Sequence, residues 1–213
     1  MSTLLFYNFK GGVGKTTISV LAADHLSRSG KKVLLIDLDA QASATLFFKN
    51  SYGDITPKRS LFNSLQKESL QPSICHLDKN LDLIPGDWDM SLWNQSLEKL
   101  PQHDRNLVLK EFISPLKEKY DFIILDVPPT LSTLVNNAVL ASDYIVLVLQ
   151  TQSSSYEGVL RTAQYLSQLR NDYDANFKLL GIVLYLVSKR ANSDTSIADE
   201  ARKTFGEAIF ANS

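Results

Sequence analysis

A glycine-rich segment near the N-terminus has the residue types needed to hold a phosphate group. It reads Lys10-Gly11-Gly12-Val13-Gly14-Lys15-Thr16-Thr17, and it ends in the Gly-Lys-Thr of the P-loop pattern Gly-x-x-x-x-Gly-Lys-Ser/Thr, although the first position is shifted. Glycines let backbone amides point inward around a β-phosphate, Lys15 would bridge the β- and γ-phosphates, and Thr16 would ligate Mg²⁺. The segment therefore predicts a site for a nucleoside triphosphate with Mg²⁺.

Lys10 is a second lysine in this loop, and it is unusual for a plain P-loop. By residue type alone it fits a solvated charge at the end of a strand as well as it fits a functional group. The loop pattern does not decide between these two interpretations.

Three aspartates follow apolar runs that read as buried strands. Asp37 and Asp39 end the run Val-Leu-Leu-Ile-Asp-Leu-Asp, and Asp126 ends the run Phe-Ile-Ile-Leu-Asp. A single aspartate in this position is commonly a cap or turn residue, but three at the ligand-binding edge of a parallel sheet favour function. Because Mg²⁺ prefers oxygen ligands and keeps several waters, Asp126 fits a carboxylate that holds a Mg²⁺-bound water. Asp39 fits a group that orients or deprotonates an attacking water.

The scaffold for these residues is predicted from strand-like and helical runs that alternate along the chain. Five runs rich in Ile, Val and Leu are typical of strands buried on both faces of a parallel sheet: residues 4–7, 33–36, 122–125, 144–149 and 179–187. Helical stripes lie between them at residues 16–29, 105–119 and 157–169. We expect an α/β fold of the P-loop NTPase type, with a mostly parallel sheet and helices on both faces.

Some details of these elements are also predicted. In the first helix, Ile18, Leu21, Ala22 and Leu26 form the expected apolar stripe, and Gly30 supplies a C-terminal stop. Pro115 should kink or end the helix of residues 105–119. Residues 50–100 are less regular, with strand candidates at 74–77 and 81–84 and a helix candidate at 87–100.

Size and composition fit one globular domain spanning residues 1–213. The chain is 44% hydrophobic and 21% charged with a formal net charge of −1, so no global charge asymmetry indicates a nucleic-acid or membrane partner. Its one cysteine, Cys75, cannot form an internal disulfide. No signal peptide pattern is present, and no apolar run approaches the ~20 residues of a membrane helix. We therefore expect a cytoplasmic protein.

Three motifs together resemble the ParA/MinD family of deviant-Walker ATPases. The loop carries the extra lysine, Lys10, that is the signature of the family. Asp37-Leu-Asp-Ala-Gln41 is close to the family's Asp-x-Asp-Pro-Gln, with Ala40 in place of proline, and Tyr120-Asp-Phe-Ile-Ile-Leu-Asp-Val-Pro-Pro129 is the third match. Fainter similarity continues through residues 136–138, 141–143 and 157–158, so the resemblance covers most of the chain in order.

The resemblance implies an ATP hydrolase that uses ATP and Mg²⁺, turns over slowly, and is stimulated by a partner. Lys10 would reach across an ATP-sandwiched homodimer to the nucleotide of the other copy, while Lys15 and Thr16 keep their P-loop roles. Asp39 would position the hydrolytic water, and Asp37 would support Mg²⁺ through waters. The implied catalytic residues are thus Lys10, Lys15 and Asp39, and the implied metal-site residues are Thr16, Asp37 and Asp126.

Within the family, the resemblance favours the plasmid and chromosome partition proteins. These bind DNA nonspecifically as ATP dimers, and a centromere-binding, ParB-like adaptor stimulates hydrolysis. The C-terminal residues lack the basic, apolar-faced pattern of a membrane-surface helix, so we expect no membrane partner. They also stop near the point where relatives usually continue with another strand and helices. The remaining basic candidates for DNA contact, and hence for nucleoid association, are Lys189, Arg190, Arg202 and Lys203.

Two alternatives stay open at this stage. The chain could be a truncated or inactive regulator that binds a nucleotide without acting on it, although the intact lysines and aspartates argue against loss of catalysis. It could also position a protein cargo in place of DNA, which the motifs do not distinguish from partition.

Overall fold

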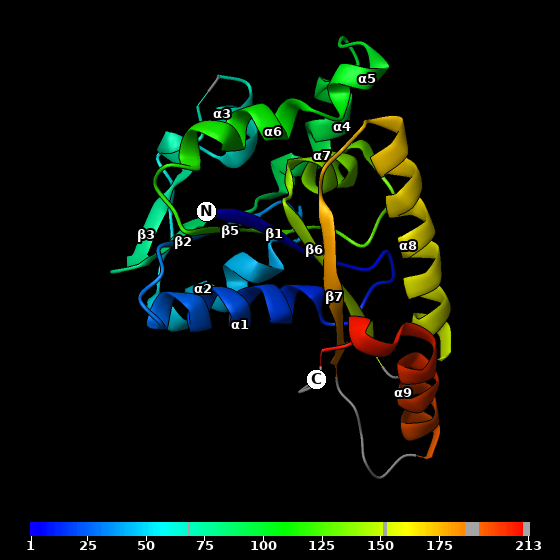
Figure 1. Cartoon of the computed structure of the whole chain (residues 1–213). Coiled ribbons are helices and arrows are strands. Elements are labelled where there is room, and N and C mark those ends of the chain that lie inside the picture. The colour runs from blue at the N-terminus through cyan, green and yellow to red at the C-terminus, as the bar shows by residue number, and fades with distance from the viewer. Residues whose placement is uncertain (68, 151–152, 186–191, 211–213) are drawn as a thin grey trace.

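A twisted, mostly parallel sheet forms the centre of the molecule (Figure 1). The computed structural model describes residues 1–67, 69–150, 153–185 and 192–210. In these residues the strand order is β3-β4-β2-β5-β1-β6-β7, and every neighbouring pair is parallel except β3 and β4. The strands are β1 (Ser2–Tyr7), β2 (Val33–Asp37), β3 (Cys75–Asp78), β4 (Leu81–Ile84), β5 (Phe122–Asp126), β6 (Tyr144–Gln150) and β7 (Lys178–Tyr185).

Helices cover both faces of this sheet, which confirms the predicted α/β fold. The helices are α1 (Lys15–Arg28), α2 (Ser43–Tyr52), α3 (Leu61–Leu65), α4 (Trp93–Ser96), α5 (Gln102–Arg105), α6 (Val108–Ile113), α7 (Thr133–Ala141), α8 (Ser153–Asp172) and α9 (Asn192–Phe205). Figure 1 shows α1 and α2 below the sheet and α6 and α7 above it, with α8 at the right. Helices from the two sides pack into two separate hydrophobic cores.

Strands β1, β2, β5, β6 and β7 contain runs of apolar residues because each of them contributes to both cores. In β2, Leu34 and Ile36 belong to the core shared with α7 and α8, whereas Val33 and Leu35 belong to the core shared with α1 and α2. All four side chains are fully buried. Successive strand residues point to opposite faces, so a strand covered on both sides needs apolar residues at every position.

The buried face of α1 differs from the predicted stripe. The buried residues of α1 lie about one turn apart and are Lys15 and the small residues Ser19, Ala23 and Ser27. Leu21, in contrast, is 59% exposed. Small side chains allow the helix axis to approach the strands closely, so the larger residues are displaced to the flanks of the helix. The predicted stripe was therefore wrong for Leu21.

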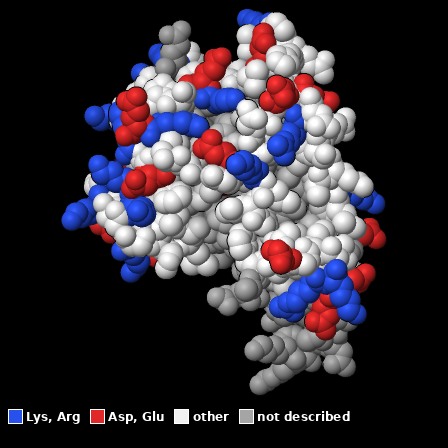
Figure 2. Space-filling view, viewed as in Figure 1, with Lys and Arg blue, Asp and Glu red and all other residues white. Residues whose placement is uncertain are grey.

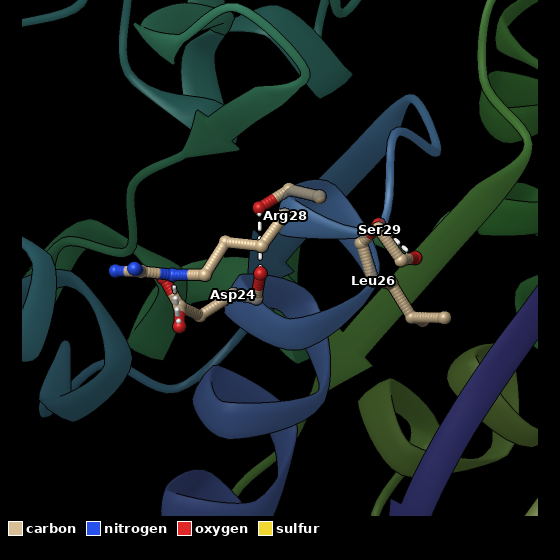
Figure 3. A network of polar contacts seen from close by, with 5 residues as sticks. Asp24, Leu26, Arg28 and Ser29 are labelled. Atoms are coloured by element: carbon tan, nitrogen blue, oxygen red, sulfur yellow. Dashed lines mark hydrogen bonds and ion pairs between the residues drawn. The ribbon is translucent and has the colours of Figure 1, made fainter.

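The C-terminal end of α1 is fixed by local hydrogen bonds, as Figure 3 shows. Arg28 Nε donates to both carboxylate oxygens of Asp24, and Ser29 Oγ donates to the carbonyl oxygen of Leu26. Gly30 then adopts a positive φ of 86° and ends the helix, as predicted.

Other differences from the prediction occur where short elements replace one long one. The helix predicted at residues 87–100 is a 3₁₀ turn (Trp88–Leu92) followed by the single turn of α4. The helix predicted at 105–119 is α6, which ends before Pro115 and continues as a 3₁₀ turn (Ser114–Leu116). Helices α2, α3, α7 and α9 were not predicted from the sequence. Among the described residues, no helix is long and apolar enough to cross a membrane.

Candidate active site

A cavity of about 350 Å³ opens at the carboxyl ends of the central strands. The glycine-rich loop between β1 and α1 forms one side of it, and the loops after β2 and β5 form the other. Its lining residues are Gly12, Gly14, Lys15, Thr16 and Thr17 from the loop and Asp39, Ser43, Phe47, Val127, Pro129 and Tyr185 from elsewhere. The position matches the edge at which open α/β sheets bind ligands.

Gly14 gives the loop its shape. It has φ 93° and ψ 14°, immediately before the first residue of α1, and no side chain caps this helix terminus. A Cβ at Gly14 would lie only 2.4 Å from the Tyr185 ring. Glycine is therefore required here both for the backbone conformation and for the close approach of Tyr185. The first residues of α1, Lys15, Thr16 and Thr17, line the cavity, so this uncapped helix terminus lies where it can bind an anion.

Lys15 is buried in this loop, with only 6% of its surface exposed. Its Nζ donates to the carbonyl oxygen of Lys10 at 2.9 Å. Burial lowers the pKa of the Lys15 ammonium to about 8, while the carboxylates of Asp126 and Asp39 act in the opposite direction. A buried cation held by one carbonyl at the mouth of an anion-binding loop is placed to exchange that carbonyl for a phosphate oxygen.

Asp126 lies beside the loop and is fully buried. Its Oδ1 accepts a hydrogen bond from Ser19 Oγ at 3.2 Å. Burial and the neighbouring Asp37 carboxylate raise the Asp126 pKa to about 7, and the hydroxyls of Thr16 and Ser19 oppose this shift. Its Oδ2 is buried and has no hydrogen-bond partner among the described residues. An orphaned carboxylate oxygen next to a threonine hydroxyl fits the all-oxygen surroundings of a hydrated Mg²⁺.

Asp37 lies opposite Asp126 in the β2–β5 register, but its carboxylate accepts hydrogen bonds from a different set of residues. Its Oδ2 accepts hydrogen bonds from Thr45 N at 2.8 Å and from Thr45 Oγ1 at 2.7 Å, and its Oδ1 accepts one from Asp39 N at 3.2 Å. Gly86 N donates in turn to Thr45 Oγ1 at 2.9 Å. Burial raises the Asp37 pKa to about 6, and the hydrogen bonds oppose that shift. Asp37 thus ties the loop after β2 to α2 and to the loop after β4.

The loop held by Asp37 contains a strained residue. Ala42 precedes α2 with φ 53° and ψ 38°, the left-handed region in which an alanine costs about 1–2 kcal/mol. We predict that Ala42→Gly stabilises the protein by about 0.5–1 kcal/mol, because relief of the strain outweighs the entropy cost of glycine. A thermal melt should show a Tm increase of about 1–4 °C. Ala44→Gly, a buried change within α2, is the matched control and should lower Tm; a fall in Tm for Ala42→Gly itself would contradict the strain argument.

The structure brings most predicted site residues together. Gly12, Gly14, Lys15, Thr16, Thr17 and Asp39 line the cavity, Val13 is buried in the core shared with α1 and α2, and Gly11 packs near Pro129. Lys10 begins the loop and contributes its carbonyl oxygen to Lys15. Among the described residues, no group of three or more acidic, histidine or cysteine side chains could hold a metal ion by itself.

Two polar residues of the site were missed from the sequence. Ser19 bonds Asp126, and Thr45 bonds Asp37. Ser19 follows the glycine-rich loop by two residues, and Thr45 follows Gln41 by four. The only available signal was a hydroxyl side chain close in sequence to a motif.

Two of the basic residues predicted to contact DNA, Arg202 and Lys203, are not among the residues that line the cavity. Arg202 and Lys203 are exposed on α9, and Arg202 Nη1 lies 3.7 Å from Asp199 Oδ1. Figure 2 shows basic and acidic side chains side by side at the lower right, where α9 lies. Lys189 and Arg190 lie outside the described residues.

A glycine-rich loop between the first strand and first helix of a parallel α/β sheet defines a P-loop NTPase. A family profile described as an AAA domain matches residues 1–179. The chain is 30% identical over 205 residues to the sporulation initiation inhibitor protein Soj of Bacillus subtilis, covering 95% of this chain and 79% of that protein. It is 33% identical over 203 residues to the chromosome-partitioning ATPase Soj of Thermus thermophilus, covering 95% of this chain and 76% of that protein.

Solved structures share this fold. A plasmid partition protein from Borrelia burgdorferi aligns with a TM-score of 0.82 at 27% identity, covering 98% of this chain and 88% of that one. Cobyrinic acid a,c-diamide synthase from Mycobacterium smegmatis, with bound ADP and magnesium, aligns with a TM-score of 0.83 at 26% identity, covering 97% and 83% of the two chains. The chain belongs to the ParA/MinD family of partition ATPases.

Proposed function

We propose that this chain is an ATP-dependent partition ATPase. It dimerises on binding ATP with Mg²⁺, binds DNA nonspecifically as that dimer, and hydrolyses ATP slowly until a centromere-binding, ParB-like partner stimulates it. The observation that carries the proposal is that Lys15 and Asp39 line one cavity, while the buried carboxylate of Asp126 and that of Asp39 both act on the Lys15 ammonium. The name of the Thermus thermophilus relative, a chromosome-partitioning ATPase, supports the cellular role.

In this proposal the loop holds the β- and γ-phosphates of ATP. Lys15 exchanges the Lys10 carbonyl for phosphate oxygens, and the N–H groups at the start of α1 add further donors. Thr16 and Asp126 hold Mg²⁺, which when bound neutralises part of the phosphate charge. The unpartnered Oδ2 of Asp126 supports this assignment. For Asp37 a water-mediated part in Mg²⁺ binding remains a prediction, beside its hydrogen bonds to Thr45.

Hydrolysis is assigned to Asp39 and Lys10. Asp39 lines the cavity and its Oδ1 accepts a hydrogen bond from Gln41 N at 2.9 Å, which fixes the carboxylate where it can orient a water. Lys10 reaches the nucleotide of the second copy and stabilises charge that develops in the transition state. Complete catalysis therefore requires the dimer, which makes ATP a timer for the assembled state.

The surface around the cavity suits a dimer that closes over ATP. Phe47 lines the cavity and is 47% exposed, and Leu131, which follows the cavity residue Pro129, is 62% exposed. In this proposal the second copy covers these two exposed apolar side chains when the dimer forms.

DNA contact is assigned to the exposed pair Arg202 and Lys203, together with Lys189 and Arg190. Such contacts are made to phosphates, so they carry no sequence preference and weaken as salt rises. This binding would place the protein on the nucleoid.

The test is binding to a nonspecific DNA duplex with Mg²⁺-ATP, with Mg²⁺-ADP, and with Mg²⁺-ATP at raised salt. We expect binding only with ATP, and a steep loss between about 50 and 200 mM salt. The Arg202→Ala and Lys203→Ala variants should weaken binding, whereas Lys99→Ala, a change of an exposed lysine in another region, should not. Equal binding in all three conditions contradicts the switch.

The same samples separate the alternatives. ATP-dependent dimers without DNA binding, seen by light scattering, would favour a protein cargo over DNA. A rate of phosphate release no greater than that of Asp39→Ala would favour an inactive nucleotide-binding regulator.

A further inference from the structure

Asn8, the residue that follows β1, is fully buried at the base of the phosphate-binding loop. Its Nδ2 donates to the carbonyl oxygen of Val148 in β6 at 2.9 Å. In the parallel register Tyr7 is the partner of Leu147, so Val148 is the next residue along β6. The Asn8 side chain thus continues the β1–β6 pairing for one more residue while the backbone leaves the sheet.

The other half of the Asn8 amide holds the loop. Its Oδ1 accepts a hydrogen bond from the backbone N–H of Lys10 at 3.0 Å. The carbonyl oxygen of the same residue, Lys10, accepts the hydrogen bond from Lys15 Nζ. The buried Asn8 side chain therefore connects the sheet to Lys10. The side chain of Lys10 is the extra lysine of the loop, and its carbonyl oxygen holds the Lys15 ammonium.

The geometry requires an amide at this position. The side chain must donate to one carbonyl and accept from one N–H, and Asn8 does both without exposure to solvent. Alanine would leave the Val148 carbonyl and the Lys10 N–H without these partners. Buried groups that lose a partner are costly, so the loop would move to regain hydrogen bonds.

Helix α8 approaches the same amide from the other side. A Cβ at Gly158, which is buried on α8, would lie 3.1 Å from Asn8 Oδ1. This distance is tighter than an ordinary contact, so any larger residue would displace the Asn8 oxygen or push the helix away. The absence of a side chain at Gly158 leaves the space in which Asn8 holds Lys10.

We propose that Asn8 is a positioning residue for ATP binding and hydrolysis, which aligns Lys10 and Lys15 through the Lys10 backbone, and that Gly158 preserves its geometry. Asn8 itself touches neither the phosphates nor the attacking water. The inference rests on the ATP site proposed above, and it requires neither DNA nor the ParB-like partner.

The test is a double-mutant cycle in the full chain with Asn8→Ala, Gly158→Ala and the combined variant. The readouts are the Kd of a fluorescent ATP analogue measured in the presence of Mg²⁺, the KM and kcat of phosphate release, and Tm. Ser167→Ala, an exposed change on the same helix, is the control. We expect Asn8→Ala to raise Kd and KM about tenfold, since an unsatisfied buried group has an effect of this order. Gly158→Ala should raise them by a smaller factor.

The combined variant is decisive. Alanine at position 8 has no oxygen for a Cβ at position 158 to displace, so the combined variant should match Asn8→Ala alone in Kd and KM. The proposal would be overturned if the effects of the two changes on Kd and KM were fully additive. It would also be overturned if Asn8→Ala lowered Tm but left Kd, KM and kcat unchanged. If Asn8→Ala does not fold, Gly158→Ala against Ser167→Ala still decides: a raised Kd supports the proposal and an unchanged Kd refutes it. Neither result bears on DNA binding, so the proposed partition function is tested separately.

Discussion

Replacement of Lys15 by alanine should reduce ATP binding and hydrolysis by about 10²–10³-fold, the effect of removing one preorganised electrostatic donor from an enzyme site. Lys15 is the buried cation of the loop, and its Nζ is held by the Lys10 carbonyl oxygen at 2.9 Å, where a phosphate oxygen can replace the carbonyl. No other cavity-lining residue in the described part of the chain carries a positive charge. Titration of Lys15→Ala with Mg²⁺ and a fluorescent ATP analogue, together with a phosphate-release assay, measures the loss.

The fold itself should tolerate this change. Burial lowers the Lys15 pKa to about 8, which means that the folded chain disfavours the charged form relative to water. Removal of the ammonium therefore takes away an unfavourable burial, and Tm of the nucleotide-free protein should stay near that of the parent. Lys31→Ala, which removes an exposed lysine beyond the end of α1, is the control and should change neither binding nor rate. Unchanged affinity of Lys15→Ala for the ATP analogue would mean that the loop is not the triphosphate site.

The edge of the sheet that carries the site could be predicted because it depends on local patterns. Continuous apolar runs indicated the parallel strands, and each run that ends in an acidic residue placed that residue at the carboxyl edge. Asp37 and Asp126 do lie opposite each other in the β2–β5 register, beside a loop whose ending the sequence already showed. Strand type and chain direction were sufficient for this part of the prediction.

The inner contacts of the site depend on tertiary packing, which no local pattern shows. Thr45 and Ser19 are polar residues on helices, a position that by itself indicates a solvent-facing side chain. They are buried because α1 and α2 approach the strand ends, and only there do their hydroxyls meet aspartates. Asn8 belongs to the same group, because its partners lie on β6 and on the loop.

Helix faces were less predictable for a related reason. The stripe of large apolar residues on α1 includes Leu21, which is exposed, while the sheet contacts small residues such as Ser19 and Ala23. Apolar periodicity assumes that the largest side chains face the core. It fails where a helix must lie close to the sheet so that its N-terminus can support a phosphate loop.

Replacement of Asp39 by alanine should separate hydrolysis from binding. We expect the rate of phosphate release to fall by about 10²–10³-fold, within the range attributed to a positioned acid–base group, while the affinity for Mg²⁺-ATP changes only a few-fold. The reason is geometric, since Asp39 lines the cavity from the loop after β2, whereas the proposed holders of the phosphates and metal, Lys15 and Thr16, line it from the start of α1. Single-turnover phosphate release and equilibrium titration with the ATP analogue measure the two quantities.

Because Asp39→Ala should slow hydrolysis without preventing ATP binding, it also tests whether ATP hydrolysis sets the lifetime of the assembled dimer. If hydrolysis ends the DNA-bound state, Asp39→Ala should remain on nonspecific DNA with ATP for longer than the parent, even when the stimulating partner is added. Asp54→Ala, an exposed change after α2, should behave as the parent does. Release of phosphate by Asp39→Ala at the parental rate would remove Asp39 from the reaction. Slow hydrolysis with unchanged residence on DNA would keep Asp39 as a catalytic residue but separate hydrolysis from DNA release. The two measurements together therefore test the chemistry of the site and the use the protein makes of it.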